Sequence, residues 1–149
     1  MQNANTQFEQ WLDVAWPVLL PALWAAICWT IAALGGWRRV AKQFAARHEP
    51  PGTTFRWMSL GIKPCTNYNL CIHAVFAEQG LYLRPIFLFR IGHHPLLIPW
   101  EKVGPIEEKK RLITLRFVTI RAAGKELVLL LPRKAAEALR TRFDAQGRL

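Results

Sequence analysis

Uncharged residues form an unbroken run of 23 positions near the N-terminus, from Val14 to Gly36. A bilayer core about 30 Å thick is crossed by roughly 20 mostly apolar helical residues, so this run is long enough to span a membrane. Leu, Ala, Ile and Trp occur on every face of it, which is typical of a helix surrounded by lipid. The pattern predicts a transmembrane helix over residues 14–36, preceded by a tail at residues 1–13.

Two other interpretations of the run are weaker. A secretory signal peptide carries a basic N-terminal region, whereas the tail contains Glu9 and Asp13 and neither Lys nor Arg. The core helix of a soluble protein is usually shorter and apolar on one face only. Pro17 and Pro21 are tolerated if the helix begins near Trp16, because the first turn has no internal partners for its N–H groups. A break at Pro21 would shorten the span.

A second apolar pattern, with helical spacing, follows directly. Val40, Ala41 and Phe44 recur on one face of this segment, and basic residues occupy the other faces. We expect an amphipathic continuation of the spanning helix, which either lies along the lipid headgroups or forms a solvated stalk. The Pro-Pro-Gly sequence at 50–52 ends it. Residues 37–52 are therefore predicted to be a juxtamembrane helix and linker.

From residue 53 onward the period of the pattern changes from helical to strand-like. The alternation predicts a first strand with a bulge near Gly61, a loop at 63–69 and a charged turn at 101–110. The predicted strands are residues 53–62, 70–77, 81–84, 96–100, 111–121 and 126–131.

A helix is predicted to close the chain. It begins at Pro132, places Ala135, Leu139 and Phe143 on one face, and ends at Gly147. The fold class expected is thus an N-terminal transmembrane helix followed by a mainly-β domain at residues 53–149. Six or seven antiparallel strands would form a sandwich or open barrel, with the last helix as its cap.

The distribution of charge predicts the orientation. All 20 Lys and Arg lie at or after Arg38, so the positive-inside rule places the tail outside and the domain in the cytoplasm, at a cell inner membrane. Tryptophan side chains are expected at the two membrane interfaces: Trp11, Trp16 and Trp37. Basic side chains are expected at the cytoplasmic headgroups: Arg38, Arg39 and Lys42.

The charge also bounds the partners. The formal net charge is +10, and because both charges before Arg38 are acidic, residues 38–149 carry an excess of +12. Beside a membrane, such charge favours anionic headgroups, at about 1 kcal/mol for each nearby Lys or Arg. Nucleic acid is the other general partner of basic domains. It is not expected here, because stacking aromatic residues do not form a recognisable nucleic-acid motif.

Candidate catalytic chemistry is sparse. The residues His73, His93, His94, Cys65 and Cys71 lack the spacing of a zinc site. Neither a nucleophile motif nor a Gly-rich phosphate loop occurs in the sequence. The sequence therefore predicts neither an enzyme, a cofactor nor a bound metal. In a cytoplasmic domain the two cysteines, like Cys28 in the helix, are expected to be reduced thiols.

Two motifs resemble those of a known superfold. GLYLR at 80–84 and LLIPWEKV at 96–103 are similar to strands of the GRAM-type and bacterial branch of pleckstrin-homology-like (PH-like) domains. The resemblance covers residues 53–146, and with its leading helix the chain resembles small bacterial single-pass membrane proteins that carry one such domain. It implies a binding platform for a lipid headgroup or a protein.

The expected function is a membrane-anchored, non-enzymatic module that tethers or scaffolds a protein partner through a sheet edge or the Trp100 loop. The alternative is an anionic-lipid-binding or lipid-sensing module. PH-like domains often place headgroup-binding charge at a strand entrance, which points to Lys109, Lys110 and Arg111. Four more arginines, on the predicted strands or in the IFLFR sequence at 86–90, offer a basic face to an acidic protein: Arg84, Arg90, Arg116 and Arg121.

Overall fold

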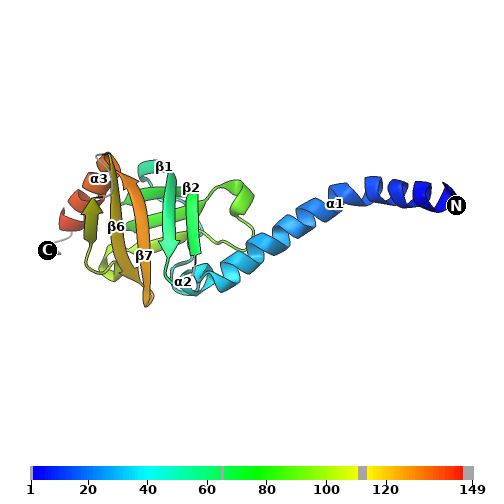
Figure 1. The fold of residues 1–149 in the computed structure, drawn as a ribbon. Helices are drawn as coiled ribbons and strands as arrows, with labels where there is room; N and C mark the ends of the chain where they lie inside the picture. Colours follow the sequence, from blue (N-terminus) through cyan, green and yellow to red (C-terminus); the bar gives the residue numbers. More distant parts are fainter. Residues whose placement is uncertain (1, 65, 111–113, 146–149) are drawn as a thin grey trace.

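The computed structural model describes residues 2–64, 66–110 and 114–145. A long helix, α1, extends from a body in which a curled β-sheet encloses the core, and a last helix, α3, lies at the opposite end of the molecule (Figure 1). The expected combination of an N-terminal apolar helix, an antiparallel mainly-β domain and a C-terminal helix is confirmed at this level of detail.

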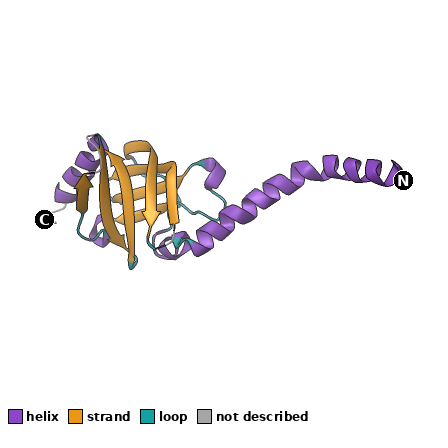
Figure 2. Ribbon diagram, in the orientation of Figure 1, coloured by secondary structure: helices purple, strands orange, loops and turns teal. Residues whose placement is uncertain are grey.

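The strands form one seven-stranded antiparallel sheet in the order β4-β3-β2-β1-β7-β6-β5, curled into a half-barrel. Two meanders, β1 to β4 and β5 to β7, are joined through the β1–β7 pair, which leaves β4 and β5 at the edges (Figure 2). The strand bounds are β1 (Gly52–Ile62), β2 (Thr66–Ala77), β3 (Gly80–Pro85), β4 (Leu96–Pro99), β5 (Glu107–Lys110), β6 (Leu115–Ala122) and β7 (Lys125–Pro132).

Helix α1 (Gln2–Leu34) runs through both of its prolines, Pro17 and Pro21. It therefore begins well before Val14, the first residue of the predicted span, and neither proline ends it. Its segment Asp13–Leu34 is long and apolar enough to cross a membrane, in agreement with the predicted span. Figure 1 shows α1 leaving the body with most of its length free of contact with the sheet.

Helix α2 (Trp37–Phe44) is neither a stalk nor a surface helix. Gly36, in the left-handed region with φ +88°, turns the chain at the end of α1. The apolar face predicted for this segment is then buried in the domain core, where Trp37 and Val40 are both 0% exposed. The residues expected to form a juxtamembrane linker instead cover the β4 edge, where Ala45 bridges to Leu96.

The strands differ from the expectation in three main features. β2 begins at Thr66 rather than at residue 70, because the polar segment expected to be a loop pairs with β1. The bulges of the β1–β2 ladder lie between Phe55 and Leu60, not at Gly61. The charged segment expected to be a turn contains β5, which pairs with β6 as an edge strand.

One core fills the concave side of the sheet and receives side chains from α2 and α3 (Arg133–Ala145). The predicted stripe of α3, made of Ala135, Leu139 and Phe143, is buried in it. The chain passes from the β4 edge toward β5 through a short 3₁₀ turn, η2 (Trp100–Lys102). The Trp100 indole is 3% exposed and donates a 2.9 Å hydrogen bond from Nε1 to the carbonyl of Ala77.

Candidate functional site

The connection between β3 and β4 lies along α1. We call residues 86–92 the η1 loop, after the 3₁₀ turn η1 (Phe87–Phe89) at its tip. The Nε1–H of Trp24 donates a 2.9 Å hydrogen bond to the carbonyl of Leu88, and the Trp24 and Phe89 ring centroids lie 5.3 Å apart. A Cβ added to Gly92 would lie 3.1 Å from the Trp29 Cα. Figure 2 shows η1 on the side of the sheet from which α1 leaves.

Three apolar side chains of this loop point to solvent. Phe87 is 77% exposed, and Leu88 and Ile91 are each more than 40% exposed. Phe89, in contrast, packs partly against the core. Three exposed apolar side chains close together in sequence are a feature of protein and membrane interaction sites when they form one patch.

A pocket of about 360 Å³ opens between this loop and strands β1 to β3. We call it the Arg84 pocket. Its walls combine apolar side chains with cations, and the residues that carry the argument below are Trp57, His73, Arg84, Phe87, Leu88 and Arg90.

The charge around the Arg84 pocket is positive. Arg84 makes a 3.0 Å ion pair with Glu49, and Arg90 also lines the pocket. His73 faces Arg84 across the β2–β3 ladder. Burial, followed by the nearby positive charges of Arg84 and Arg56, lowers the pKa of His73, so its ring is neutral at pH 7. Two arginines thus line the pocket, and one of them is paired with a carboxylate.

His73 also has an unsatisfied polar atom. Its Nε2 is buried and has no hydrogen-bond partner among the described residues. Such atoms are uncommon in folded proteins because an unpaired buried polar group costs about 1–3 kcal/mol. A ligand or water that entered the pocket would supply the missing partner.

Trp57 completes the pocket wall from a strained position. Its φ is +58°, in the left-handed region, where a non-glycine residue is disfavoured. The side chain is 61% exposed and meets the His73 ring edge-on at 6.1 Å. Strain of this kind concentrates at binding sites, because it persists only where the surrounding structure or the function requires it.

The far end of the η1 loop is held by an aromatic cluster of Trp37, Tyr68 and His93, whose ring centroids are 5.2–5.3 Å apart. His93 Nδ1 lies 3.1 Å from the carbonyl of Ile91, which can only accept, so Nδ1 carries the proton. Nε2 then accepts from the Tyr68 hydroxyl at 3.0 Å. The cluster ties α2, β2 and the loop together at the base of α1.

The predicted membrane-interface residues fall into two groups, exposed and buried. Trp11 and Trp16 are exposed on α1, as an interfacial role requires. Arg38, Arg39 and Lys42 are exposed beyond its end, and the Arg38 guanidinium lies 5.1 Å from the centre of the Trp29 ring. Trp37 instead belongs to the core and donates from Nε1 to the carbonyl of His94 at 2.8 Å, so its indole is not available to lipid.

The predicted binding residues are scattered. Trp100 is buried in the core and cannot serve as an exposed contact. Lys109 is exposed on the edge strand β5, with Lys110 at the end of that strand, and Arg111 lies outside the described residues, as does Cys65. These lysines are on the β5 side of the sheet, away from the Arg84 pocket, which is formed by strands β1 to β3.

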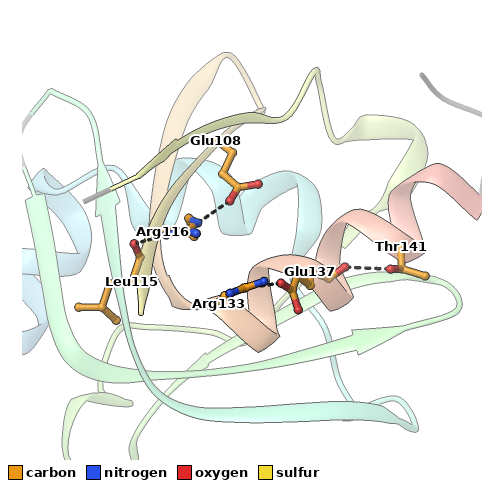
Figure 3. Close-up of polar contacts among 6 residues, drawn as sticks. All are labelled: Glu108, Leu115, Arg116, Arg133, Glu137 and Thr141. Carbon is orange, nitrogen blue, oxygen red and sulfur yellow. Dashed lines mark hydrogen bonds and ion pairs between the residues drawn. The ribbon is translucent and has the colours of Figure 1, made fainter. Parts of the chain in front are cut away.

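A second polar cluster lies beside α3. Arg116 pairs with Glu108 at 3.0 Å, and Arg133 pairs with Glu137 at 2.7 Å (Figure 3). A pocket of about 390 Å³ lies between them and Arg140. Its arginines are matched by carboxylates, so it has less uncompensated charge than the Arg84 pocket.

Sequence reasoning missed the η1 loop and the Arg84 pocket as a site. The signal was the apolar sequence IFLF between Pro85 and Arg90, which does not alternate as a strand should. The sequence matches no protein-family model and no curated protein. Function is therefore inferred from the geometry of the chain itself.

Proposed function

We propose that this protein is a membrane-anchored, non-enzymatic binding module whose domain holds an anionic lipid headgroup in the Arg84 pocket. The observation that supports this most strongly is the position of the pocket. One of its walls is the η1 loop, which lies against the membrane-spanning segment of α1. A lipid next to α1 therefore needs only a short displacement to place its phosphate between Arg84 and Arg90.

The chemistry of the pocket fits a phosphodiester. Guanidinium groups bind phosphate through paired, charge-assisted hydrogen bonds. A volume of about 360 Å³ falls in the range of small-ligand pockets, roughly 300–1,000 Å³, and the exposed rings of Trp57 and Phe87 provide an apolar rim for the glycerol and upper acyl chain.

The proposal includes the fold family and the orientation. A curled antiparallel sheet of seven strands followed by a C-terminal helix supports assignment to the PH-like superfold. The absence of Lys and Arg before Arg38 supports a cytoplasmic domain. Under this proposal the domain binds anionic lipids in the cytoplasmic leaflet of the membrane in which it is anchored, so its occupancy depends on the lipid composition of that leaflet.

The test measures thermal unfolding of the full chain in a neutral detergent while a short-chain lipid is added. Dioctanoyl phosphatidylglycerol is expected to raise the Tm, and dioctanoyl phosphatidylcholine is not. Glycerol phosphate separates recognition of the headgroup alone from recognition of the whole lipid. At a lipid concentration about 100 times the Kd, the stabilisation is about 2.7 kcal/mol.

Arg90→Gln removes a cation without breaking the Arg84–Glu49 pair. It is expected to raise the phosphatidylglycerol concentration that is needed for a given Tm shift at least tenfold. Arg140→Gln, the same exchange on α3 at the opposite end of the molecule, is the control and should leave it unchanged. Equal Tm shifts with the two lipids, or an undiminished shift in Arg90→Gln, would refute a headgroup site.

The protein partner expected from the sequence stays a prediction. The exposed β5 edge and the polar face of α3 are the surfaces farthest from α1 in Figure 1, and they would remain accessible while the Arg84 pocket faces lipid. A protein that purifies in stoichiometric amount with the full chain, and is lost in Arg140→Glu but retained in Arg90→Gln, would establish tethering as a second function.

A further inference from the structure

The depth of the η1 loop follows from its contacts on α1. With α1 spanning a membrane, we place the boundary of the apolar layer between Trp29, beside which the charged Arg38 head is held, and Leu34, the last residue of the apolar segment. Trp24 precedes these residues by five and ten positions, so at about 1.5 Å per residue it lies roughly 7 to 15 Å inside the boundary. The tip of the loop is hydrogen-bonded to Trp24 and therefore lies at that level.

The side chains at this level suit acyl chains. Phe87, Leu88 and Ile91 are exposed and apolar, and the turn that carries the first two is in contact with Trp24 of α1. Arg84 and Arg90 are long enough to extend their charged heads toward the headgroups while their methylene stems stay in an apolar environment.

Most backbone carbonyls of the loop are hydrogen-bonded within the chain. Irregular backbone is tolerated at membrane depth only where its polar groups are satisfied internally. Five carbonyls of the η1 loop accept hydrogen bonds from within the chain, including that of Leu88 from Trp24 Nε1 and that of Ile91 from His93 Nδ1. The residues are Ile86, Phe87, Leu88, Arg90 and Ile91.

We infer that the η1 loop inserts its tip into the acyl region of the leaflet at the C-terminal end of α1, where Phe87, Leu88 and Ile91 contact lipid chains. The domain is then held in the membrane at two places, by α1 and by the loop, and keeps one orientation to the bilayer. This inference rests on α1 spanning the membrane. It does not require the Arg84 pocket to bind a headgroup.

The bilayer is the occupant that the geometry favours over a protein. The loop contacts Trp24, which belongs to the apolar segment of α1, and where that segment spans a membrane lipid must cover its exposed side chains. A protein that covered the loop alone would have to enter the same leaflet beside α1.

The test places a fluorescent probe at the loop tip of the full chain. Phe87→Cys is labelled with the fluorophore NBD and reconstituted into vesicles of phosphatidylcholine, with or without phosphatidylcholine brominated on the acyl chain. Glu137→Cys on α3 is the matched control, and the native chain, whose described cysteines Cys28 and Cys71 are buried, is the labelling blank.

Insertion predicts that brominated lipid reduces the emission at position 87 to less than half and leaves position 137 unchanged, whereas iodide in the buffer quenches only position 137. Quenching of position 87 by iodide but not by brominated lipid would overturn the inference. So would an efficient disulfide between two unlabelled Phe87→Cys chains, which would mean that a second copy covers the loop. Because the vesicles contain only phosphatidylcholine, the result is independent of the headgroup proposal.

Discussion

The indole of Trp24 and the carbonyl of Leu88, 64 positions apart in sequence, are joined by a 2.9 Å hydrogen bond that fixes the tip of the η1 loop against α1. The donor belongs to the apolar segment of α1 and the acceptor to the β-domain, so this contact, together with the packing of Trp24 on Phe89 and of Gly92 on Trp29, holds the loop against α1. Several consequences of the arrangement can be measured.

Replacing Trp24 by Phe keeps an aromatic ring near Phe89 and removes the Nε1 donor. A hydrogen bond of this kind contributes about 1 kcal/mol, so we expect amide hydrogen exchange in residues 86–92 to accelerate roughly fivefold. Exchange in β7 should not change. Trp16→Phe, on the part of α1 remote from the loop, is the control. Unchanged exchange in the loop of the Trp24 variant would show that the contact does not hold the loop.

The tryptophans of this chain are expected to divide into two classes. Trp37→Ala leaves a large cavity in the core and an unpaired carbonyl at His94, so it should lower the free energy of unfolding by about 3–5 kcal/mol. Trp16→Ala, on an exposed face of α1, should have little effect in detergent. Denaturant unfolding of the two variants measures the difference. Similar losses in both would contradict the placement of Trp37 in the core.

Acid should weaken the aromatic cluster at the base of α1. Burial lowers the pKa of His93 below its usual 6.5, so the folded state binds fewer protons than the unfolded state. Stability from this group is complete above about pH 6.5 and declines as the pH falls from there toward the folded pKa. His73, whose pKa is also lowered, contributes with the same sign.

Thermal unfolding between pH 8 and about 5 measures this loss. His93→Gln keeps an acceptor for Tyr68 and should flatten the pH dependence, whereas His94→Gln, which changes an exposed ring, should retain it. A profile that stays the same in His93→Gln would assign the acid sensitivity to His73 instead.

Trp57→Asn tests whether backbone strain is maintained for binding. Asn tolerates positive φ, so relief of about 1 kcal/mol should offset much of the lost packing and leave the Tm nearly unchanged or raised. The phosphatidylglycerol-dependent shift should nevertheless fall, because the pocket loses a wall. Leu70→Asn, with φ +52° but no part in the Arg84 pocket, is expected to keep that shift. Equal lipid responses in the two variants would argue against a binding role for Trp57.

The features predictable from sequence were those with a local cause. Apolar alternation indicated most of the strands, and the uninterrupted apolar run indicated the span. Strand β5 was not predicted, because Glu107 to Lys110 are all charged. An edge strand can nevertheless pair with its neighbour without an apolar face. The start of β2 was not predicted for a related reason. Tyr68 is buried there, but its neighbour Asn67 is polar and exposed, so the segment resembles a polar loop.

The candidate site could not be predicted in the same way, because it is made by contacts between distant segments. Trp37 adjoins the span as an interfacial tryptophan would, and its burial depends on a partner 57 positions away, His94. The pairing of the η1 loop with α1 likewise leaves no trace in the local pattern. What the sequence does show is an apolar tetrad, Ile86 to Phe89, that no strand needs.

The link between the loop and α1 also changes the affinity that the loop requires. Three apolar side chains would give a soluble protein only a weak and short-lived attachment to a vesicle. In the proposed arrangement α1 confines them beside the bilayer, so their insertion is an intramolecular step with an effective concentration on the order of millimolar. Three exposed apolar side chains at the tip of the loop would therefore be enough. Larger or smaller side chains at these positions would change how strongly the loop is held in the bilayer, while α1 would still anchor the protein.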